Sequence, residues 1–361
     1  MGKKEKTNEK KLKNENNKKN NKKKARKGRI FLLVILIALI IGGSVFGYQI
    51  YQNGGGMQGM LATLVGHNEN TLKNLDPIYI LLMGESTDIP LTDTIIVASY
   101  NPKEQTAALL SIPRDTFTGT NTSTATSYQK INTAYRGGDE PENAVKVVNK
   151  ITGLDIEYYV VVDTAILREL VDEIGGVWFD VPIDMKYDHH AEKLYIDLKA
   201  GYQLLDGGKS EQLVRFRHNN NGSTYPSEYG VEDLGRMRTS REFITEVLKQ
   251  TMKPENIFKI GTFLDIGHKN VKTNIPISVA KDYIPYAVNF KTENIASATL
   301  PGTTPSASST NDVSLFIHNT KETKKLVDEM FLGIVPEEEN GDIVSNNTIN
   351  GNTTTSGNST R

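Results

Sequence analysis

An apolar run of nineteen residues without a charge, IFLLVILIALIIGGSVFGY at positions 30–48, constrains the fold of this chain more than any other feature. As an α-helix the run is about 28 Å long, which matches the ~30 Å hydrocarbon thickness of a bilayer. It is longer than the apolar core of a cleavable signal peptide, and Phe46, Tyr48 and Tyr51 stand where interfacial aromatic residues are common. The sequence therefore predicts an uncleaved transmembrane signal-anchor helix over residues 30–51.

The charges on the two sides of this run differ, and they predict its orientation. Residues 1–29 carry fourteen lysines and arginines against three glutamates, whereas the rest of the chain carries 28 basic and 40 acidic residues. Because basic flanks stay on the cytoplasmic side, we expect a basic cytoplasmic tail at 1–29, a single pass through the cell membrane, and residues 52–361 outside. A basic tail can also bind nucleic acid, but beside a membrane span it is more typical of a topology signal, so we expect no nucleic-acid partner.

Composition divides the exported part into three segments. Residues 52–75 contain Gly54-Gly55-Gly56 and few periodic apolar positions, which predicts a stalk. Residues 336–361 are mostly Asn, Thr, Ser, Gly and acidic residues, a composition that favours a disordered tail. The folded domain is therefore expected at 76–335. The chain has no cysteine, which excludes disulfides, thiolate metal sites and cysteine nucleophiles.

Within the expected domain, the period of the apolar residues changes repeatedly between two and 3.6 residues. Strands are predicted at 78–83, 94–100, 107–112, 158–162, 177–181 and 295–300. Helices are predicted at 142–152, 164–174, 234–252, 280–290 and 321–331. This interleaving indicates an α/β class with a mixed central β-sheet sandwiched by helices. Trp178, within one predicted strand, is expected in the core.

Arginines and aspartates stand at the ends of these predicted elements. They are Asp93, Arg114, Asp115, Arg215, Arg217, Asp233, Arg236 and Arg238. Guanidinium groups bind phosphate oxygens through paired hydrogen bonds, and carboxylates hold the divalent metals that bridge phosphates. Each residue also fits an ordinary role, as part of a surface ion pair or, for Asp233, as a helix N-cap. The residues by themselves therefore leave a phosphate site and a structural role open.

Eight sequence strings occur in order over residues 76–335 and resemble the motifs of the LytR-CpsA-Psr family. They are ILLMG (80–84), TDTIIVASYNP (92–102), LLSIPRDT (109–116), KINTAYRGG (130–138), VDEIGGVWFDVP (171–182), AGYQLLDG (200–207), VRFRH (214–218) and YGVEDLGRMR (229–238). The combination of LSIPRDT and KINTAYRGG at this distance is highly specific. A single span behind a short basic tail is also the layout of the family.

This resemblance implies a function and a fold. Members of the family are extracytoplasmic transferases of Gram-positive envelopes. They transfer a glycopolymer, of the teichoic acid or capsular polysaccharide type, from a polyprenyl-pyrophosphate carrier to peptidoglycan, assisted by Mg²⁺ or Mn²⁺. The implied fold is an α/β/α sandwich with an apolar tunnel for the polyprenyl chain. The expected partners are the lipid-linked donor, the peptidoglycan acceptor and the membrane.

The resemblance also implies the site residues. Arg114 resembles the main phosphate-contacting arginine, Asp93 the metal-linked aspartate, and Asp233 an orienting carboxylate or a base; these three are the expected catalytic residues. The expected pyrophosphate-binding residues are Arg114, Arg215, Arg217, Arg236 and Arg238. The expected supporting residues are Asp115, Lys130 and Asn132.

The chain departs from the family pattern at three places. Ser86 stands where a second metal-linked aspartate is common, and Leu91 stands where an arginine often precedes the (S/T)-D-T string. Thr239-Ser240 stands where Arg-Gln is frequent. Glu85 and Asp88 are candidates for the missing carboxylate, and Arg238 and Arg241 for the missing positive charge. These departures keep open a non-catalytic protein that binds polyprenyl-phosphate lipids; a transcriptional attenuator conflicts with the predicted topology.

An apolar stripe on two predicted helices suits a lipid tail. The candidates for the tunnel lining are Ile166, Leu170, Phe243, Ile244 and Val247, although such a stripe more often packs in a core. A polyprenyl tail gains about 0.8 kcal/mol for each CH₂ group removed from water. The family's substrate therefore requires a hollow within the domain.

Overall fold

The computed structural model describes residues 42–68, 70–85, 91–135, 141–190, 194–230, 232–251, 253, 256 and 271–334. The predicted tails at 1–29 and 336–361, and residues 30–41 of the predicted span, lie outside the described residues. The described part of the first helix covers residues 42–52. Within the described ranges, no helix has both the length and the apolar composition that a membrane crossing requires.

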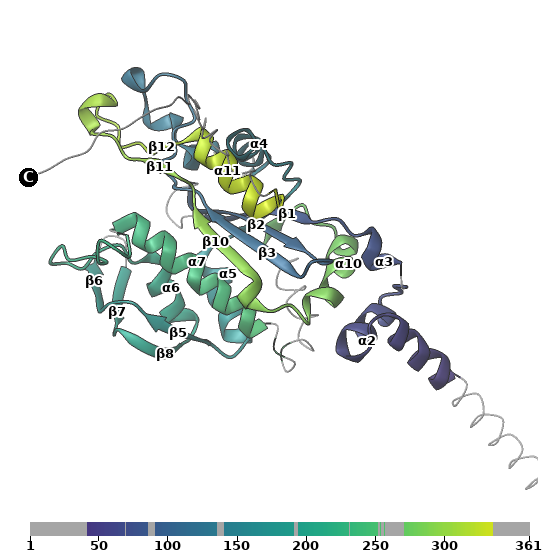
Figure 1. Cartoon of the computed structure of the whole chain (residues 1–361). Helices are drawn as coiled ribbons and strands as arrows, with labels where there is room; N and C mark the ends of the chain where they lie inside the picture. The colour runs from purple at the N-terminus through teal and green to yellow at the C-terminus, as the bar shows by residue number, and fades with distance from the viewer. Residues whose placement is uncertain are drawn as a thin grey trace, which may run out of the picture.

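A six-stranded mixed sheet forms the centre of the molecule, with the strand order β10-β3-β2-β1-β4-β9 (Figure 1). Its antiparallel meander consists of β1 (Ile78–Glu85), β2 (Thr92–Asn101) and β3 (Thr106–Ser111). β4 (Tyr158–Val162) lies parallel to β1, and β10 (Ile295–Thr299) lies parallel to β3. The short β9 (Lys272–Thr273) pairs antiparallel with β4 at one edge.

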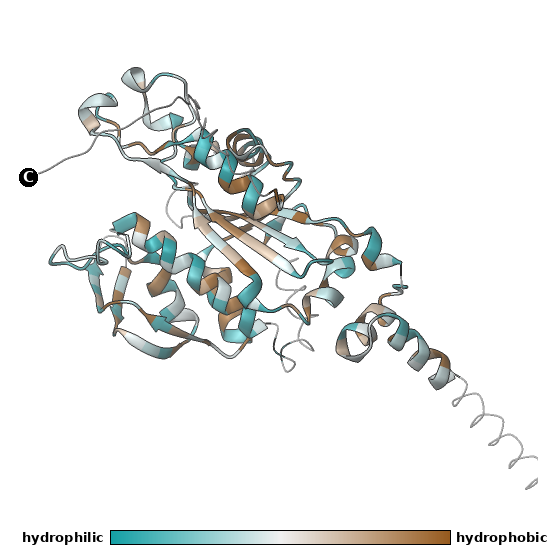
Figure 2. Ribbon diagram, in the orientation of Figure 1, coloured by the Kyte–Doolittle hydropathy of each residue, from teal (hydrophilic) through white to brown (hydrophobic). Residues whose placement is uncertain are grey.

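Helices cover both faces of this sheet (Figure 1). One face carries α4 (Pro141–Thr152) and α11 (Thr320–Phe331), and the other carries α5 (Thr164–Glu173), α6 (Gly207–Arg215) and α7 (Glu232–Thr251). The sheet strands are largely hydrophobic, while the helices are hydrophobic along one side only (Figure 2). This arrangement confirms the predicted α/β fold with a mixed sheet between helices.

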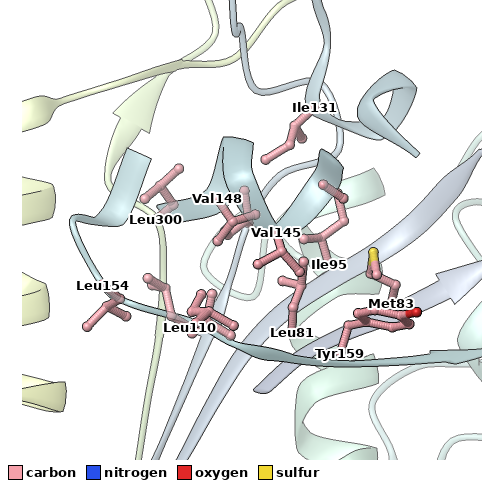
Figure 3. Packing of buried hydrophobic residues seen from close by; sticks show 14 of the residues in the cluster. Leu81, Met83, Ile95, Leu110, Ile131, Val145, Val148, Leu154, Tyr159 and Leu300 are labelled. Atoms are coloured by element: carbon pink, nitrogen blue, oxygen red, sulfur yellow. The ribbon is translucent and has the colours of Figure 1, made fainter. Parts of the chain in front are cut away.

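The two faces of β1 serve different purposes. Leu81 is fully buried against Val145 and Val148 of α4 in the main core (Figure 3). Leu82, the next residue, lies on the opposite face of the strand and lines a cavity. The strand is therefore apolar on both faces, as expected for a sheet covered on both sides, and one of those faces is only partly filled.

A second core lies on the α5–α7 side, beneath two antiparallel strand pairs. The first pairs β5 (Val177–Val181) with β8 (Gly201–Leu205), and the second is the hairpin of β6 (Met185–His189) and β7 (Leu194–Leu198). Val177, Phe179 and Val181 point into this core. The expectation that Trp178 is buried was wrong: it is 45% exposed and stacks on Tyr202, because alternate residues of a strand face opposite sides.

The predicted stalk contains two helices, α2 (Gly56–Leu64) and α3 (Thr71–Asn74). Ala62 of α2 is fully buried, and α2 lies beside α10 (Ile277–Ala287) at the N-terminal end of the domain (Figure 1). The remaining strands, β11 (Gly302–Thr303) and β12 (Ile317–His318), pair with each other.

Candidate active site

A cavity of about 840 Å³ lies between the second face of the sheet and the helices α5 and α7. The carboxyl ends of the parallel strands β1 and β4 both contribute to it, through Gly84 and Glu85 and through Val162 and Asp163. In α/β sheets the carboxyl ends of parallel strands are a common place for ligands. The cavity has the volume of a small-molecule binding site.

Most of the cavity wall is apolar. Its large apolar side chains are Leu82, Met83, Leu91, Leu167, Leu170, Leu194, Val214, Phe243, Ile244 and Leu248. Three of the five candidate tunnel residues are among them. The other two pack elsewhere: Ile166 is buried, and Val247 packs against the second core.

The polar part of the cavity wall is organised around Asp233, in the first turn of α7. Its Oδ1 accepts hydrogen bonds from Nε and Nη2 of Arg236, at 3.1 and 2.7 Å. Arg217 Nη2 lies 3.4 Å from the same oxygen, and Arg114 Nε lies 3.6 Å from Oδ2. One carboxylate thus brings together three arginines that are far apart in the sequence.

Asp93 ties this arginine cluster to the sheet. Arg114 Nη1 donates a hydrogen bond of 2.5 Å to Asp93 Oδ1, and Arg236 Nη2 donates to the backbone carbonyl of Asp93 at 3.0 Å. Arg236 is only 4% exposed. A buried guanidinium group is stable only when it is paired and hydrogen-bonded, and these contacts hold it in one position.

The cluster carries a net positive charge, with Arg114, Arg217 and Arg236 facing Asp93 and Asp233. Burial alone would raise the pKa of Asp233, but the charges of Arg236, Arg114 and Arg217 outweigh that effect and hold the pKa below its ordinary value. Burial and the repulsion from Arg236 and Arg114 lower the pKa of Arg217. A site that repels one of its own cations is suited to bind an anion.

The supporting residues lie next to Arg114. Asn132 donates a backbone hydrogen bond to the carbonyl of Arg114 at 3.1 Å and also lines the cavity. Its side-chain oxygen is buried and has no hydrogen-bond partner within the described part of the chain. Lys130 Nζ lies 2.9 Å from Asp115 Oδ1, so Asp115 is paired with a lysine. Arg215 lines the cavity but is paired with Glu211 on its own helix, at 3.1 Å.

The structure does not bring Arg238 into the cluster. Arg238 pairs with Glu242 at 2.8 Å, and its guanidinium group lies 4.2 Å from the centre of the Tyr229 ring. Arg241, the other candidate for the missing positive charge, donates hydrogen bonds to Ser111 and Thr299. It therefore binds the ends of β3 and β10.

The candidate metal ligands are only partly described. Asp93 and Glu85 both line the cavity, and they lie on adjacent strands whose ends are paired, since Glu85 lies opposite Thr92. Glu85 Oε2 accepts a hydrogen bond from Tyr135 at 3.2 Å and lies 3.7 Å from Lys272. Asp88 lies outside the described residues. Among the residues that are described, no group of three or more acidic, histidine or cysteine residues could hold a metal by itself.

Comparison with known proteins places this site in a family. The model of the LytR_cpsA_psr family matches residues 45–331, which is most of the chain. The chain belongs to the LytR-CpsA-Psr family. The motifs that carry the resemblance in the sequence are therefore family motifs. Three of the residues read from them, Arg114, Arg217 and Arg236, surround Asp233 in the structure, and Asp93 binds two of these arginines.

Several relatives within the LytR-CpsA-Psr family carry transferase names. The polyisoprenyl-teichoic acid–peptidoglycan teichoic acid transferase TagV of Bacillus subtilis is 28% identical over 254 residues, which cover 67% of this chain and 62% of TagV. The transferase of the same description, TagU of Bacillus cereus, is 30% identical over 261 residues, which cover 67% of this chain and 77% of TagU. The biofilm regulatory protein A of Streptococcus mutans is 28% identical over 229 residues, which cover 59% of this chain and 53% of that protein. The chain thus spans about half to three quarters of the length of these relatives.

Solved structures share the fold of this LytR-CpsA-Psr protein. The crystal structure of B. subtilis TagV superposes with a TM-score of 0.56 and 26% identity, covering 72% of this chain and 99% of that one. TagT bound to LIIa-WTA superposes with a TM-score of 0.52 and 21% identity, covering 71% of this chain and 89% of that one. At these identities the likeness supports the architecture described above, with the same sheet between helices.

Proposed function

We propose that this protein is an extracytoplasmic phosphotransferase that attaches a glycopolymer to peptidoglycan. The donor is a polymer of the teichoic acid or capsular polysaccharide type on a polyprenyl-pyrophosphate carrier. The N-terminal helix anchors the chain in the cell membrane, with the N-terminus in the cytoplasm and the domain outside. One observation carries the proposal: Arg114, Arg217 and Arg236 converge at a cavity of about 840 Å³ whose wall is mostly apolar. A pyrophosphate with an isoprenoid tail needs both features.

The chemical step is a displacement at phosphorus. A hydroxyl group of the acceptor glycan attacks the sugar-proximal phosphorus, a new O–P bond forms, and the bond to the bridging oxygen breaks, so that polyprenyl phosphate leaves. Such a reaction needs positive groups that are already in place around the phosphate oxygens. The ion pairs with Asp93 and Asp233 fix the arginines in advance.

Asp233 serves this reaction by orienting arginines. Three guanidinium groups share its carboxylate, and its lowered pKa makes it a weak base. Of the two roles that the motif allows, orientation therefore has the stronger physical support.

Asp93 and Glu85 suit a Mg²⁺ or Mn²⁺ ion. Magnesium binds through one or two protein carboxylates and completes its coordination with substrate phosphates and water, and both carboxylates line the cavity that would hold the phosphates. When bound, the ion would neutralise part of the charge of the pyrophosphate.

The direct test is a transfer assay with the full-length protein in liposomes. The liposomes contain a polyprenyl-pyrophosphate-linked glycopolymer, and peptidoglycan and magnesium are added. We expect phosphodiester-linked product from the wild type and a loss of roughly a hundredfold or more in Arg114→Ala. Arg238→Ala is the matched control, because Arg238 is 42% exposed and pairs with Glu242 outside the arginine cluster. Equal product from the two variants would refute the proposal.

One observation favours a second function, the binding of polyprenyl-phosphate lipids without turnover. Leu91 lines the cavity at the position where an arginine often stands in the family motif, so the cavity has one positive charge fewer to stabilise a transition state. The same assay separates the two functions, because a pure lipid-binding protein would retain the labelled donor and yield no linked product.

A further inference from the structure

The segment between the predicted span and the domain forms a closed helical unit over residues 42–67, which we call the membrane-proximal unit. Its two helices are joined by Gly54, Gly55 and Gly56, all with positive φ angles that favour glycine. The helices touch at Gly59, where an added Cβ would lie 2.2 Å from the backbone oxygen of Ile50. The contact therefore requires glycine.

Asn53 closes the membrane-proximal unit. Its side-chain amide donates to Thr63 Oγ1 and to the backbone oxygen of His67, at 3.0 Å in both cases. Asn53 is 8% exposed. A buried amide that donates hydrogen bonds to two groups beyond a turn holds the turn in place. The residues between Asn53 and His67 therefore act as one rigid body.

The unit is docked on α10. His67 Nε2 lies 3.2 Å from Asp282 Oδ1, and its ring stacks on Tyr286 with the ring centres 5.7 Å apart. Asn289 donates to the side chain of Gln58 at 3.0 Å. The His67 side chain is only 6% exposed. A flexible stalk would need none of these contacts, so the segment is held against the domain.

The membrane-proximal unit exposes several large apolar side chains. Tyr48 and Tyr51 on the first helix are 62% and 76% exposed, and Leu64 and Val65 at the end of α2 are 63% and 40% exposed. Tyr48 closes the apolar run that begins at residue 30. Exposed tyrosines and aliphatic side chains that continue a membrane-spanning sequence are typical of the lipid interface.

We propose that the membrane-proximal unit seats the domain on the outer leaflet of the membrane. Its exposed apolar side chains lie in the phospholipid interface, and the His67–Asp282 contact holds α10 above it. The cavity then stands at a fixed height and tilt over the bilayer that contains the lipid-linked donor. This inference rests on the proposed membrane anchor and lipid-linked substrate. A flexible tether would lose conformational entropy each time the domain bound its donor. A fixed link avoids this cost, because it is already ordered.

The first test measures membrane contact by single-cysteine labelling, which the cysteine-free chain allows. A fluorophore is attached to Tyr48→Cys, Leu64→Cys or Tyr202→Cys of the full-length protein in phosphatidylglycerol–phosphatidylethanolamine liposomes, and quenching by nitroxide lipids is recorded. We expect strong quenching at positions 48 and 64 and little at 202, a tyrosine that is 71% exposed on β8. Quenching at 48 alone would overturn the seating of α2, and quenching at none of the three would overturn the anchor as well.

The second test measures the effect of the docking contact on transfer. We expect Asp282→Ala to lower transfer from a long-chain donor in liposomes roughly tenfold, because small displacements of reacting groups are costly, and to leave transfer from a water-soluble short-chain donor unchanged. Asp282→Asn keeps an acceptor for His67 and should restore most of the loss. Equal effects on both donors, or no effect on either, would overturn the positioning role. A wild type inactive on both donors would instead refute the proposed function.

Discussion

Arg217 differs from the other arginines of the cluster, because burial and its positive neighbours oppose its charge. An arginine in such a position suits the binding of an anion, as we propose for Arg217. We expect Arg217→Ala to lower donor binding and transfer roughly a hundredfold and to leave the melting temperature unchanged or slightly higher. Calorimetry measures the melting temperature of the variant, and the liposome assay measures its transfer activity. A large loss of stability would show that Arg217 mainly supports the fold.

Arg236 and Arg238 offer a matched pair two residues apart on one helix. Arg236 is buried and bonded to Asp233 and Asp93, so we expect Arg236→Ala to lower the free energy of unfolding by about 3 kcal/mol and to abolish transfer. Arg238 is 42% exposed beside Glu242, so Arg238→Ala should cost less than about 1 kcal/mol and keep most of the activity. Denaturant titrations measure the free energy of unfolding of both variants. Similar losses in the two would contradict the placement of Arg236 inside the cluster and Arg238 outside it.

The lowered pKa of Asp233 predicts a pH dependence of stability. The ion pairs of Asp233 stabilise the fold at pH values where its carboxylate is charged in both the folded and the unfolded protein. This contribution is lost as pH falls below about 4 and through the lowered pKa of the folded state. Asp233→Asn should therefore be less stable than the wild type at pH 7, and the difference should shrink on acidification. Urea unfolding at neutral and acidic pH measures this. A difference that stays constant with pH would exclude the carboxylate charge as its cause.

The residues that motifs fix were the most predictable part of the site. Asp93, Arg114, Arg217, Arg236 and Asp233 meet, although nothing in their spacing along the chain indicates that they are neighbours in space. The position of Arg238 could have been found from the helix itself. Two residues along a helix are separated by about 200°, so Arg238 cannot share a face with Arg236, and Glu242 four residues later is a ready partner.

At the scale of elements, strongly periodic segments were predicted well. Apart from the short β9 and from α6, which were not predicted, the strands of the central sheet and the helices on both of its faces were read from apolar spacing, because burial selects that spacing. Of the strand pairs β5–β8 and β6–β7, only β5 was predicted, since the pairing of these strands is set by tertiary contacts. α2 was read as stalk because its glycines and its short length hide a helix whose stability comes from packing on α10.

Adjacent residues of α5 test whether the cavity is a lipid tunnel. Leu170 lines the cavity, whereas Val171 is fully buried in the second core. We expect Leu170→Trp to fill part of the cavity and weaken binding of a polyprenyl-pyrophosphate donor roughly tenfold, with little change in stability. Val171→Trp should overpack the core and cost about 1–3 kcal/mol. Lipid-binding isotherms and thermal melts measure the two variants, and undiminished binding in Leu170→Trp would argue against the tunnel.

At the scale of the whole molecule, three features suit the substrate that we propose. In that proposal the apolar run and the membrane-proximal unit hold the domain near the leaflet where the donor resides, the cavity offers an apolar wall for its tail, and the arginine cluster meets its pyrophosphate. The sequence alone indicates the first and, through motifs, the last. The cavity itself depends on the space that the sheet and α7 leave between them. Local sequence patterns do not predict such a space.

The central claim is that the arginine cluster binds the pyrophosphate of a polyprenyl donor. The most direct measurement is a crystal structure of the protein with a polyprenyl pyrophosphate. The account predicts phosphate oxygens within hydrogen-bonding distance of Arg114, Arg217 and Arg236, with the isoprenoid chain along Leu170 and Phe243. A lipid bound elsewhere, or a pyrophosphate that touches none of these arginines, would contradict it.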